Sequence, residues 1–408
     1  MKKVLSLFSG CGGMDIGFEG NFHVLKECVN AKKHPTWIKA VNNDRVLLAD
    51  TGFKTIFSND ILKEAAKAWK LYFNSLNDNN IDIYKTDSIV DLVKRHKSGE
   101  KIFPENVDIV TGGFPCQDFS LAGKRKGFSS HKNHLGKIDE NIPTSENRGC
   151  LYMWMREVIS ITRPKVFFAE NVKGLVSLGD AKKIIESDFA SIDGDGYFVF
   201  PAKILNAGEY GVPQKRERII FIGLNRSYLK PGVIEKIENN EIDLYPPITH
   251  NINNKSTLFD DKDLYPIVTT RIAFKGLKEP HLSSDLAQKA YSKAKFIKKG
   301  QGSTEVNLDG LGPTIRAEHH GNIEFRRLNK EHCGKYSEEI NLGCIERRLT
   351  VRECARIQTF PDEYEFVKEG VLSASSAYKV IGNAVPPLLA YNIAKHISEL
   401  WDVLFKKD

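Results

Sequence analysis

A cysteine occupies an unusual backbone context in the segment GGFPCQDFS, residues 112–120. The segment follows an apolar run at residues 107–110, which is typical of a buried β-strand. A cysteine with only a packing role belongs within such a run, where it behaves as a small hydrophobe. Cys116 instead follows Pro115, which fixes its own φ, and two glycines that permit positive φ. The pattern indicates a loop that presents a thiol at the end of a strand.

A glycine-rich loop, LFSGCGGMDIGF at residues 7–18, connects a short first strand to an expected helix. Glycines at this place let a bound ligand approach the backbone at the carboxyl ends of the strands. The loop lacks the G-x-G-x-x-G spacing of a dinucleotide site. Asp15, near the start of the helix, disfavours a pyrophosphate there and suits a cationic ligand. S-adenosylmethionine, a sulfonium with an amino-acid tail, is such a ligand.

Polar and acidic residues follow two further strand candidates, in AVNNDR at 40–45 and SNDIL at 58–62. At the ends of strands they could hold the hydroxyls of a ribose and the amino group of an adenine, respectively. Alternatively, Asp44 and Asp60 are turn residues or helix N-caps, which is the favoured interpretation for either residue taken alone.

Short apolar runs alternate with helical patterns along the first half of the chain. This alternation predicts an α/β fold, Rossmann-like, with a parallel sheet and helices on both sides. In LTVRECARIQTFPD, Thr350 and Glu353 predict a capping box that opens a further helix. The polar stretch 74–106 is expected to be a surface insertion. The strand candidates are residues 4–8, 37–41, 54–57, 107–110, 166–169 and 218–223, and the helical patterns cover residues 61–73, 151–161 and 388–404.

The composition and the pattern of the sequence change after Gly223. Residues 225–345 are rich in Asn, Lys, Asp and Gly and show no βα alternation. We therefore predict a catalytic domain at residues 1–224, a smaller irregular domain at 225–345, and a C-terminal segment at 346–408 that returns to the first domain.

The composition is that of a soluble globular protein, with 41% hydrophobic and 27% charged residues among 408. No apolar run is long enough for a membrane span or a signal peptide. Seven cysteines without a C-x-x-C pair argue against a disulfide framework and a zinc site, so we expect no metal and a reducing cytoplasm. The formal net charge of +7 is compatible with a polyanionic partner but does not establish one.

Several blocks occur in one order that closely resembles the DNA (cytosine-5) methyltransferase family of the bacterial restriction-modification type. The blocks cover nearly the whole chain except residues 225–345, and no single block would be specific. They are FSGCGG, GGFPCQDFS, NRG at 147–149, AENV at 169–172, QKRERIIFIG at 214–223, LTVRECARIQTFPD at 349–362 and IGNAVPP at 381–387.

The resemblance implies catalytic roles for four residues. Cys116 matches the family's nucleophile, and Glu170 matches the acid that holds cytosine N3. Arg218, the second arginine of Q-x-R-x-R, matches the group that contacts O2. Arg216 would steady Glu170 or the phosphate of the flipped nucleotide.

The resemblance also implies a binding site for S-adenosylmethionine. The family often has a glutamate that grips the ribose at the end of the second strand; aligning Asp44-Arg45 with the usual Asp-Lys places Asn42 there. We expect Asn42, or alternatively Asp44, to hold the ribose. The other implied contacts are Phe8, Cys11 and Gly13 around the methionine part, Asp60 and Ile61 at the adenine, and Pro115, Leu151, Asn383 and Val385 along the same pocket.

These roles predict an enzyme that methylates C5 of cytosine. A thiolate that adds at C6 breaks the aromaticity of the ring and makes C5 nucleophilic toward the sulfonium methyl group. The base must leave the duplex first, at a cost of about a few kcal/mol. Residues 225–345 would read the target sequence, and the loop LAGKRKGF at 121–128 could close over the DNA. We expect a monomer that acts on double-stranded DNA beside a restriction endonuclease.

Other functions fit the sequence less well. A thiol hydrolase would need a histidine partner for Cys116, and none is fixed by the sequence. A nicotinamide oxidoreductase would need the missing glycine fingerprint. An inactive DNA-binding relative would not need Cys116, Glu170 and Arg218. The tRNA-methylating branch of the same family has a smaller variable region than the roughly 120 residues found between the catalytic blocks.

Overall fold

The fold was analysed on a computed structural model of the chain. The structure describes residues 1–76, 82–115, 151–252, 263–298, 300–317, 323–369 and 371–407, with the side chain of residue 337 left out. Cys116, the loop at 121–128 and the NRG block lie outside the described residues.

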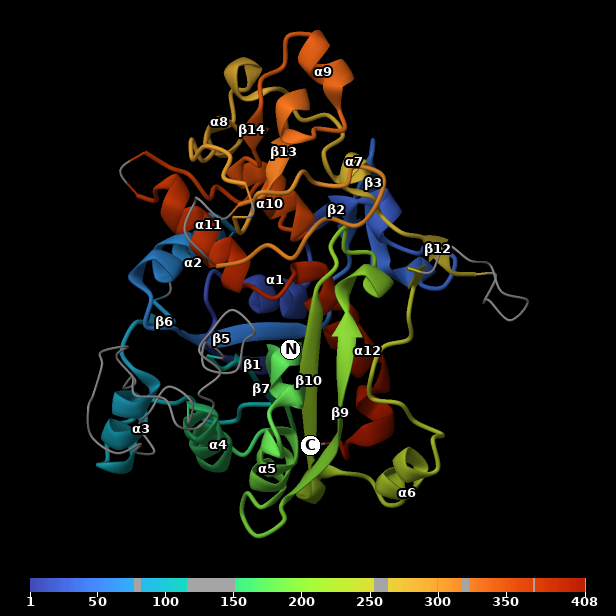
Figure 1. Cartoon of the computed structure of the whole chain (residues 1–408). Coiled ribbons are helices and arrows are strands. Elements are labelled where there is room, and N and C mark those ends of the chain that lie inside the picture. The colour runs from blue at the N-terminus through green and yellow to red at the C-terminus, as the bar shows by residue number, and fades with distance from the viewer. Residues whose placement is uncertain are drawn as a thin grey trace.

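Among the described residues, a central sheet of seven strands has the order β6-β5-β1-β7-β8-β10-β9 (Figure 1). Strands β5, β1, β7 and β8 run parallel, so their carboxyl ends meet at one edge, called here the carboxyl edge. The strands are β1 (Lys2–Leu7), β5 (Phe53–Asn59), β6 (Tyr84–Lys85), β7 (Ile109–Gly113), β8 (Val166–Val172), β9 (Tyr197–Asn206) and β10 (Glu217–Asn225).

The sheet is mixed rather than parallel throughout, because β10 pairs with both β8 and β9 in antiparallel fashion. This reversal has a consequence for the site. The amino end of β10 lies at the carboxyl end of β8, where Arg218 is registered with Val172 and Ile220 with Glu170.

Helices cover both faces of the sheet, as predicted for an α/β fold. One apolar core joins β1, β7 and β8 to α1, α2 and α12, and a second core on the other face joins them to α3, α4 and α5. The predicted capping box at Thr350 and Glu353 is present and opens α10. These helices are α1 (Gly13–Glu19), α2 (Lys63–Leu76), α3 (Ile89–Lys97), α4 (Leu151–Thr162), α5 (Ala181–Ala190), α10 (Val351–Ile357), α11 (Ala374–Asn383) and α12 (Pro387–Leu404).

Two expectations about the first half of the chain were wrong. The strand candidate at 37–41 does form a strand, β3 (Ile38–Asn42), but it belongs to a separate small sheet with β2 (His23–Leu25) and β4 (Arg45–Leu48). The stretch 74–106 is not a mere surface insertion, since its described part supplies the edge strand β6 and the helix α3, which buries four of its apolar side chains.

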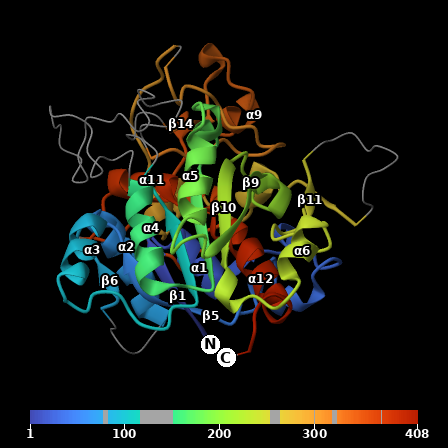
Figure 2. The same cartoon turned by 90° about the horizontal axis from the view of Figure 1, so that it is seen from below.

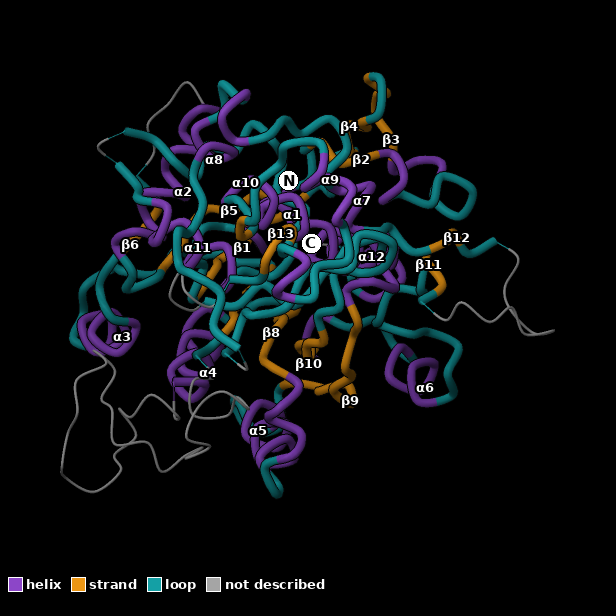
Figure 3. Tube along the Cα trace, turned by 45° about the horizontal axis from the view of Figure 1, so that its top comes forward, coloured by secondary structure: helices purple, strands orange, loops and turns teal. Residues whose placement is uncertain are grey.

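Between Asn225 and α10 the described chain forms short elements joined by long loops (Figure 3). Most of them lie above the sheet in the view of Figure 1, while α6 lies near its foot. The domain boundaries proposed at 224 and 345 remain predictions. The elements are α6 (Val233–Glu238), β11 (His250–Asn251), β12 (Tyr265–Pro266), α7 (Thr270–Ala273), α8 (Leu286–Lys289), β13 (Phe325–Arg327), α9 (Ser337–Asn341) and β14 (Arg347–Arg348). Within the described ranges, no helix is long and apolar enough to cross a membrane.

Candidate active site

An ion pair between Glu170 and Arg218 lies at the carboxyl edge. Arg218 Nε is 2.7 Å from Glu170 Oε1, and both side chains are about nine-tenths buried. The register explains the pairing: Glu170 on β8 lies opposite Ile220 on β10, so Arg218 is its diagonal neighbour on the same face. The pair places a carboxylate and a guanidinium, both good partners for the polar edge of a base, side by side.

The two glycines before Phe114 serve close approach, not positive φ. Gly112 and Gly113 extend β7 as ordinary strand residues. A Cβ on Gly112 would lie 2.9 Å from Met155 Sδ of α4, and one on Gly113 would lie 3.0 Å from Glu170 Oε2. The second carboxylate oxygen of Glu170, which is not the one paired with Arg218, is therefore turned toward the end of β7.

Asn171 links the end of β7 to β8. Its buried side-chain amide donates a hydrogen bond of 3.2 Å to the carbonyl of Phe114, one residue before Pro115. The described range 82–115 ends at Pro115, two residues after Gly113, which is registered with Glu170, and one residue before Cys116. Asn171 belongs to the AENV block, but the sequence alone indicated no role for it. Only the fold shows which carbonyl its side chain contacts.

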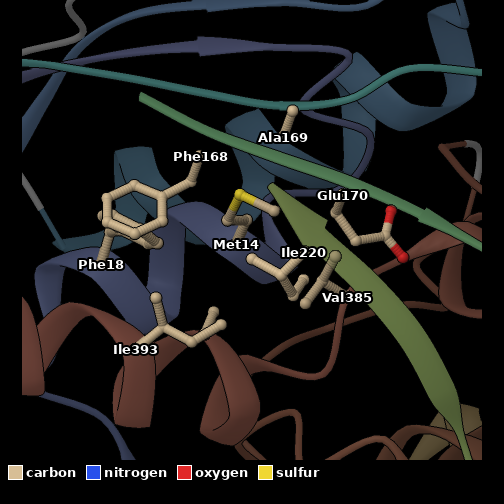
Figure 4. Close-up of a pocket in the computed structure, with 9 residues that line it drawn as sticks. Met14, Phe18, Phe168, Ala169, Glu170, Ile220, Val385 and Ile393 are labelled. Atoms are coloured by element: carbon tan, nitrogen blue, oxygen red, sulfur yellow. The ribbon is translucent and has the colours of Figure 1, made fainter. Parts of the chain in front are cut away.

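Beneath Glu170 lies a small apolar pocket of about 10 Å³, enough for roughly one water molecule. It is lined by Met14 of α1, Ile220 of β10 and Val385, and Figure 4 shows the Glu170 carboxylate at one end, pointing away from Phe18 and Phe168. The pocket is too small for a nucleotide, so it belongs to the packing that supports Glu170.

The glycine turn after β1 has the features of a ligand cradle. Gly10 has a φ of +55°, and in the described part of the chain no atom beyond its two neighbouring residues lies within 4 Å of the position that a Cβ on it would take. The Asp60 carboxylate accepts hydrogen bonds from the backbone N–H of Gly10, at 3.0 Å, and of Leu62, at 2.8 Å. The Tyr84 hydroxyl donates to the Gly10 carbonyl. An open backbone turn beside a braced carboxylate fits the hydroxyls of a nucleoside.

The C-terminal segment 383–385 packs directly against this turn. A Cβ on Gly13 would lie 2.2 Å from the Val385 carbonyl oxygen, so only glycine allows the contact. Cys11 is fully buried, its thiol donates to the Val380 carbonyl, and burial raises the pKa of the thiol well above its usual range. Cys11 is thus a packing residue of the turn rather than a reactive thiol.

The remaining predicted cofactor contacts lie at or near the carboxyl edge. Phe8 directly follows β1 and has a positive φ of 51°. Leu151 is buried at the start of α4, whereas Asn383 is exposed at the end of α11. Ile61 is exposed just after β5.

Asn42 is not brought to this site. It is exposed at the end of β3, in the small sheet, and Asp44 lies in the turn that follows it. On the side of β1 away from β7, the neighbouring strand is β5, which ends at Asn59 and is followed by Asp60. The next strand edge is β6, which is followed by Asp87, a residue that the sequence analysis did not consider. Asn59 donates to the carbonyl of Asp87 and so ties these two strand ends together.

Asp15 has a structural role, contrary to the expectation that it faces a cationic ligand. It is 1% exposed, and its carboxylate accepts hydrogen bonds from Ser6 at 2.5 Å, Trp69 at 2.7 Å and Ser58 at 3.2 Å. Burial raises the pKa of Asp15 to about 6, although these three donors act in the opposite direction. Asp15 thus ties β1, β5 and α2 together beneath the glycine turn.

The raised pKa of Asp15 predicts a defined pH dependence of stability. Between its ordinary value of 3.8 and about 6, the folded state binds the proton more tightly than the unfolded state. The free energy of unfolding therefore falls as pH rises through this window, by about 3 kcal/mol from this group. Asp15→Asn should lack this contribution, so its stability relative to wild type should rise by about that amount between pH 4 and 7.5. Denaturant unfolding at both pH values measures it, and a constant offset would contradict it.

Arg216 has other partners than expected. It is 1% exposed, and its two terminal nitrogens donate to the backbone carbonyls of Ile315, Gly382 and Ala384. The carboxylate of Glu170 pairs with Arg218 instead. The two arginines of Q-x-R-x-R therefore point to different parts of the molecule, as expected for residues two apart on an extended segment.

Comparison with known proteins agrees with this geometry. The family model of C-5 cytosine-specific DNA methylases matches residues 2–399. The chain belongs to this family. One relative is the Type II methyltransferase M.BspRI of Lysinibacillus sphaericus, which is 31% identical over 97% of this chain and 81% of the relative. Another is the Type II methyltransferase M.BsuRI of Bacillus subtilis, which is 32% identical over 97% of this chain and 79% of the relative. Among solved structures, the S. pombe Dnmt2 methyltransferase shares the fold, with a TM-score of 0.55 and 14% identity over 99% of both chains.

Membership of the C-5 cytosine-specific DNA methylase family confirms the resemblance seen in the sequence and the α/β methyltransferase fold. The enzyme is thus a DNA cytosine-5 methyltransferase. Its carboxyl edge carries Glu170 and Arg218 on one side and the glycine turn on the other.

Proposed function

We propose that this chain transfers a methyl group from S-adenosylmethionine to C5 of a cytosine that has left the duplex, through a covalent bond between Cys116 and C6. The observation that carries the proposal is the Glu170–Arg218 ion pair at the end of β8, with the other carboxylate oxygen, Oε2, turned toward the strand that leads to Cys116.

Cys116 is assigned as the nucleophile. Its thiolate would add to C6 of cytosine, and the electron pair of the C5–C6 double bond would make C5 nucleophilic. C5 would then take the methyl group of S-adenosylmethionine, whose S–CH3 bond breaks as S-adenosylhomocysteine leaves. A base then removes the C5 proton, and the thiolate leaves as the double bond re-forms. The Asn171 amide, which holds the carbonyl two residues before Cys116, would fix the direction in which the chain leaves β7.

Glu170 and Arg218 are assigned to the polar edge of the cytosine. Addition at C6 places negative charge on N3 and O2. Glu170 Oε2 would hold or protonate N3, and the Arg218 guanidinium would donate to O2, so both groups stabilise charge that develops only during the reaction. Because each is about nine-tenths buried, these interactions are stronger than they would be in water.

S-adenosylmethionine would supply an electrophilic methyl group on a sulfonium. We assign its ribose hydroxyls to Asp60, because that carboxylate follows the strand next to β1 and lies beside the open glycine turn. We assign the adenine amino group to Asp87, which follows β6, the strand next to β5 in the sheet. Phe8, Gly13 and Val385 would surround the methionine part.

Residues 225–345 are proposed to read the DNA sequence, and a restriction endonuclease is proposed as functional partner because the relatives are Type II methyltransferases. The region provides basic and polar side chains, among them TTRIAFKG at 269–276, that suit phosphate and groove contacts.

Methyl-labelled S-adenosylmethionine tests the substrate assignment directly. The purified chain is incubated with mixed-sequence duplex DNA or with tRNA, and the modified base is identified and mapped. We expect label in DNA alone, as 5-methylcytosine within one short recurring sequence. Label in adenine, or in tRNA alone, would overturn the proposal.

A further inference from the structure

We propose that Arg216 is a positioning residue that couples DNA recognition to cofactor binding. The inference rests on the proposed function and adds to it a physical link between the two binding sites. Arg216 donates to backbone carbonyls of two segments, one in the region proposed to read the DNA and one beside the expected cofactor pocket.

The recognition side of the link is the segment 312–317. Arg216 Nη1 donates to the Ile315 carbonyl at 2.9 Å. The neighbouring backbone is joined in the same way: Lys215 N–H donates to the Gly312 carbonyl at 2.9 Å, and the Thr314 hydroxyl donates to the Lys215 carbonyl at 2.5 Å. This segment belongs to the region 225–345 that is proposed to read the DNA, and it carries Arg316, a partly exposed cation that pairs with Glu324 at 3.0 Å.

The cofactor side of the link is the segment 382–385. Arg216 Nη2 donates to the carbonyls of Gly382, at 3.0 Å, and Ala384, at 2.9 Å. The next carbonyl, that of Val385, lies against Gly13 of the glycine turn, where a Cβ would approach it to 2.2 Å. Arg216 thus holds the backbone on both sides of Asn383, adjacent to the expected cofactor pocket.

The two segments also touch each other directly. A Cβ on Gly382 would lie 2.2 Å from the carbonyl carbon of Arg316. Arg216 is charged and 1% exposed. If one of the three carbonyls moved away, the guanidinium would lose a hydrogen bond in a place where water cannot replace it, which costs free energy. A displacement of the recognition segment is therefore transmitted to the cofactor segment, and the reverse. Such coupling between two binding equilibria must be reciprocal.

Arg216→Lys tests the link, because lysine keeps the charge but cannot reach three carbonyls with the geometry of a planar fork. The affinity of the full-length protein for S-adenosylhomocysteine, an unreactive probe, is measured by calorimetry with and without duplex DNA that carries the mapped target. In the wild-type protein we expect DNA to raise this affinity about 5-fold or more, the usual range of coupling. In Arg216→Lys the increase should fall to within about twofold.

Arg348→Lys is the matched control. Arg348 is also 1% exposed and donates to backbone carbonyls, among them those of Ala294 and Gly302 at 2.9 Å each, but these belong to the recognition region alone. It should lower the thermal stability as much as Arg216→Lys does and leave the effect of DNA on cofactor affinity unchanged.

A second variant keeps the proposal testable if Arg216→Lys fails to fold. Thr314→Val removes only the hydrogen bond to Lys215, at a half-buried position, and should reduce the coupling in part. The inference would be overturned if DNA raised the affinity for S-adenosylhomocysteine as much in both Arg216→Lys and Thr314→Val as it does in the wild-type protein. So would a wild-type protein that methylates DNA without any coupling. A wild-type protein that methylates no DNA would instead refute the proposed function.

Discussion

Cys116→Ser should abolish methyl transfer, with a loss of about 10⁴-fold or more in turnover, the scale seen when the nucleophile of a covalent mechanism is removed. A serine hydroxyl stays protonated at neutral pH and adds poorly to C6. The affinity for S-adenosylhomocysteine should stay within about threefold of wild type, because the glycine turn and Asp60 are untouched. Single-turnover kinetics with labelled cofactor measure the first effect, and calorimetry measures the second.

Cys333→Ser provides the control, since Cys333 is an exposed cysteine in the region after Asn225. It should retain wild-type turnover. If Cys116→Ser kept more than about a tenth of the wild-type rate, the covalent mechanism assigned to this residue could not stand.

Glu170→Gln should lower the rate of methyl transfer by about 100-fold or more, within the range that a positioned proton donor contributes. The amide preserves the shape of the side chain but cannot transfer a proton to N3, and it leaves the buried guanidinium of Arg218 without its counter-ion. The effect should fall on the chemical step, so the KM for the cofactor should change by less than about threefold. Pre-steady-state methylation of a single-site duplex separates these quantities.

Glu217→Gln is a suitable comparison, because Glu217 begins β10, next to Arg218, and also pairs with a cation, Lys173 at 2.9 Å, but at a partly exposed position. Its rate should remain close to that of wild type, as expected for a surface ion pair. Equal losses in Glu170→Gln and Glu217→Gln would indicate damage to β10 rather than loss of a catalytic group.

Local sequence patterns predicted most of the elements of the catalytic fold. The apolar runs of β1, β5, β7, β8 and β10 and the amphipathic patterns of α2 and α4 are short-range signals, and so is the capping box at Thr350. Sheet membership is not such a signal. The runs at 38–42 and 53–59 both read as strands, yet only the second pairs with β1, because pairing depends on contacts between distant segments. The antiparallel direction of β10 was missed for the same reason.

The sequence predicted the site residues whose role follows from their chemical type. It did not predict the residues whose role depends on what they contact in the fold. The block around Glu170 and the second arginine of Q-x-R-x-R led to the ion pair that the structure contains. Asp15 and Arg216 have the residue types expected of a ligand contact, but both are 1% exposed and bonded within the protein. Asn42 was selected by aligning Asp44-Arg45 with the family's usual Asp-Lys, and that alignment leads to the small sheet rather than to the strand beside β1. Asp60 acquires its position from the pairing of β5 with β1.

The central claim, a bond between Cys116 and the base, is tested most directly by covalent capture. A duplex with 5-fluorocytosine at the mapped target position blocks loss of the C5 substituent, so the protein should remain attached after methyl transfer. Peptide mapping by mass spectrometry should place the adduct on Cys116, and Cys116→Ser should give none. Capture through another residue, or undiminished capture by Cys116→Ser, would contradict the account.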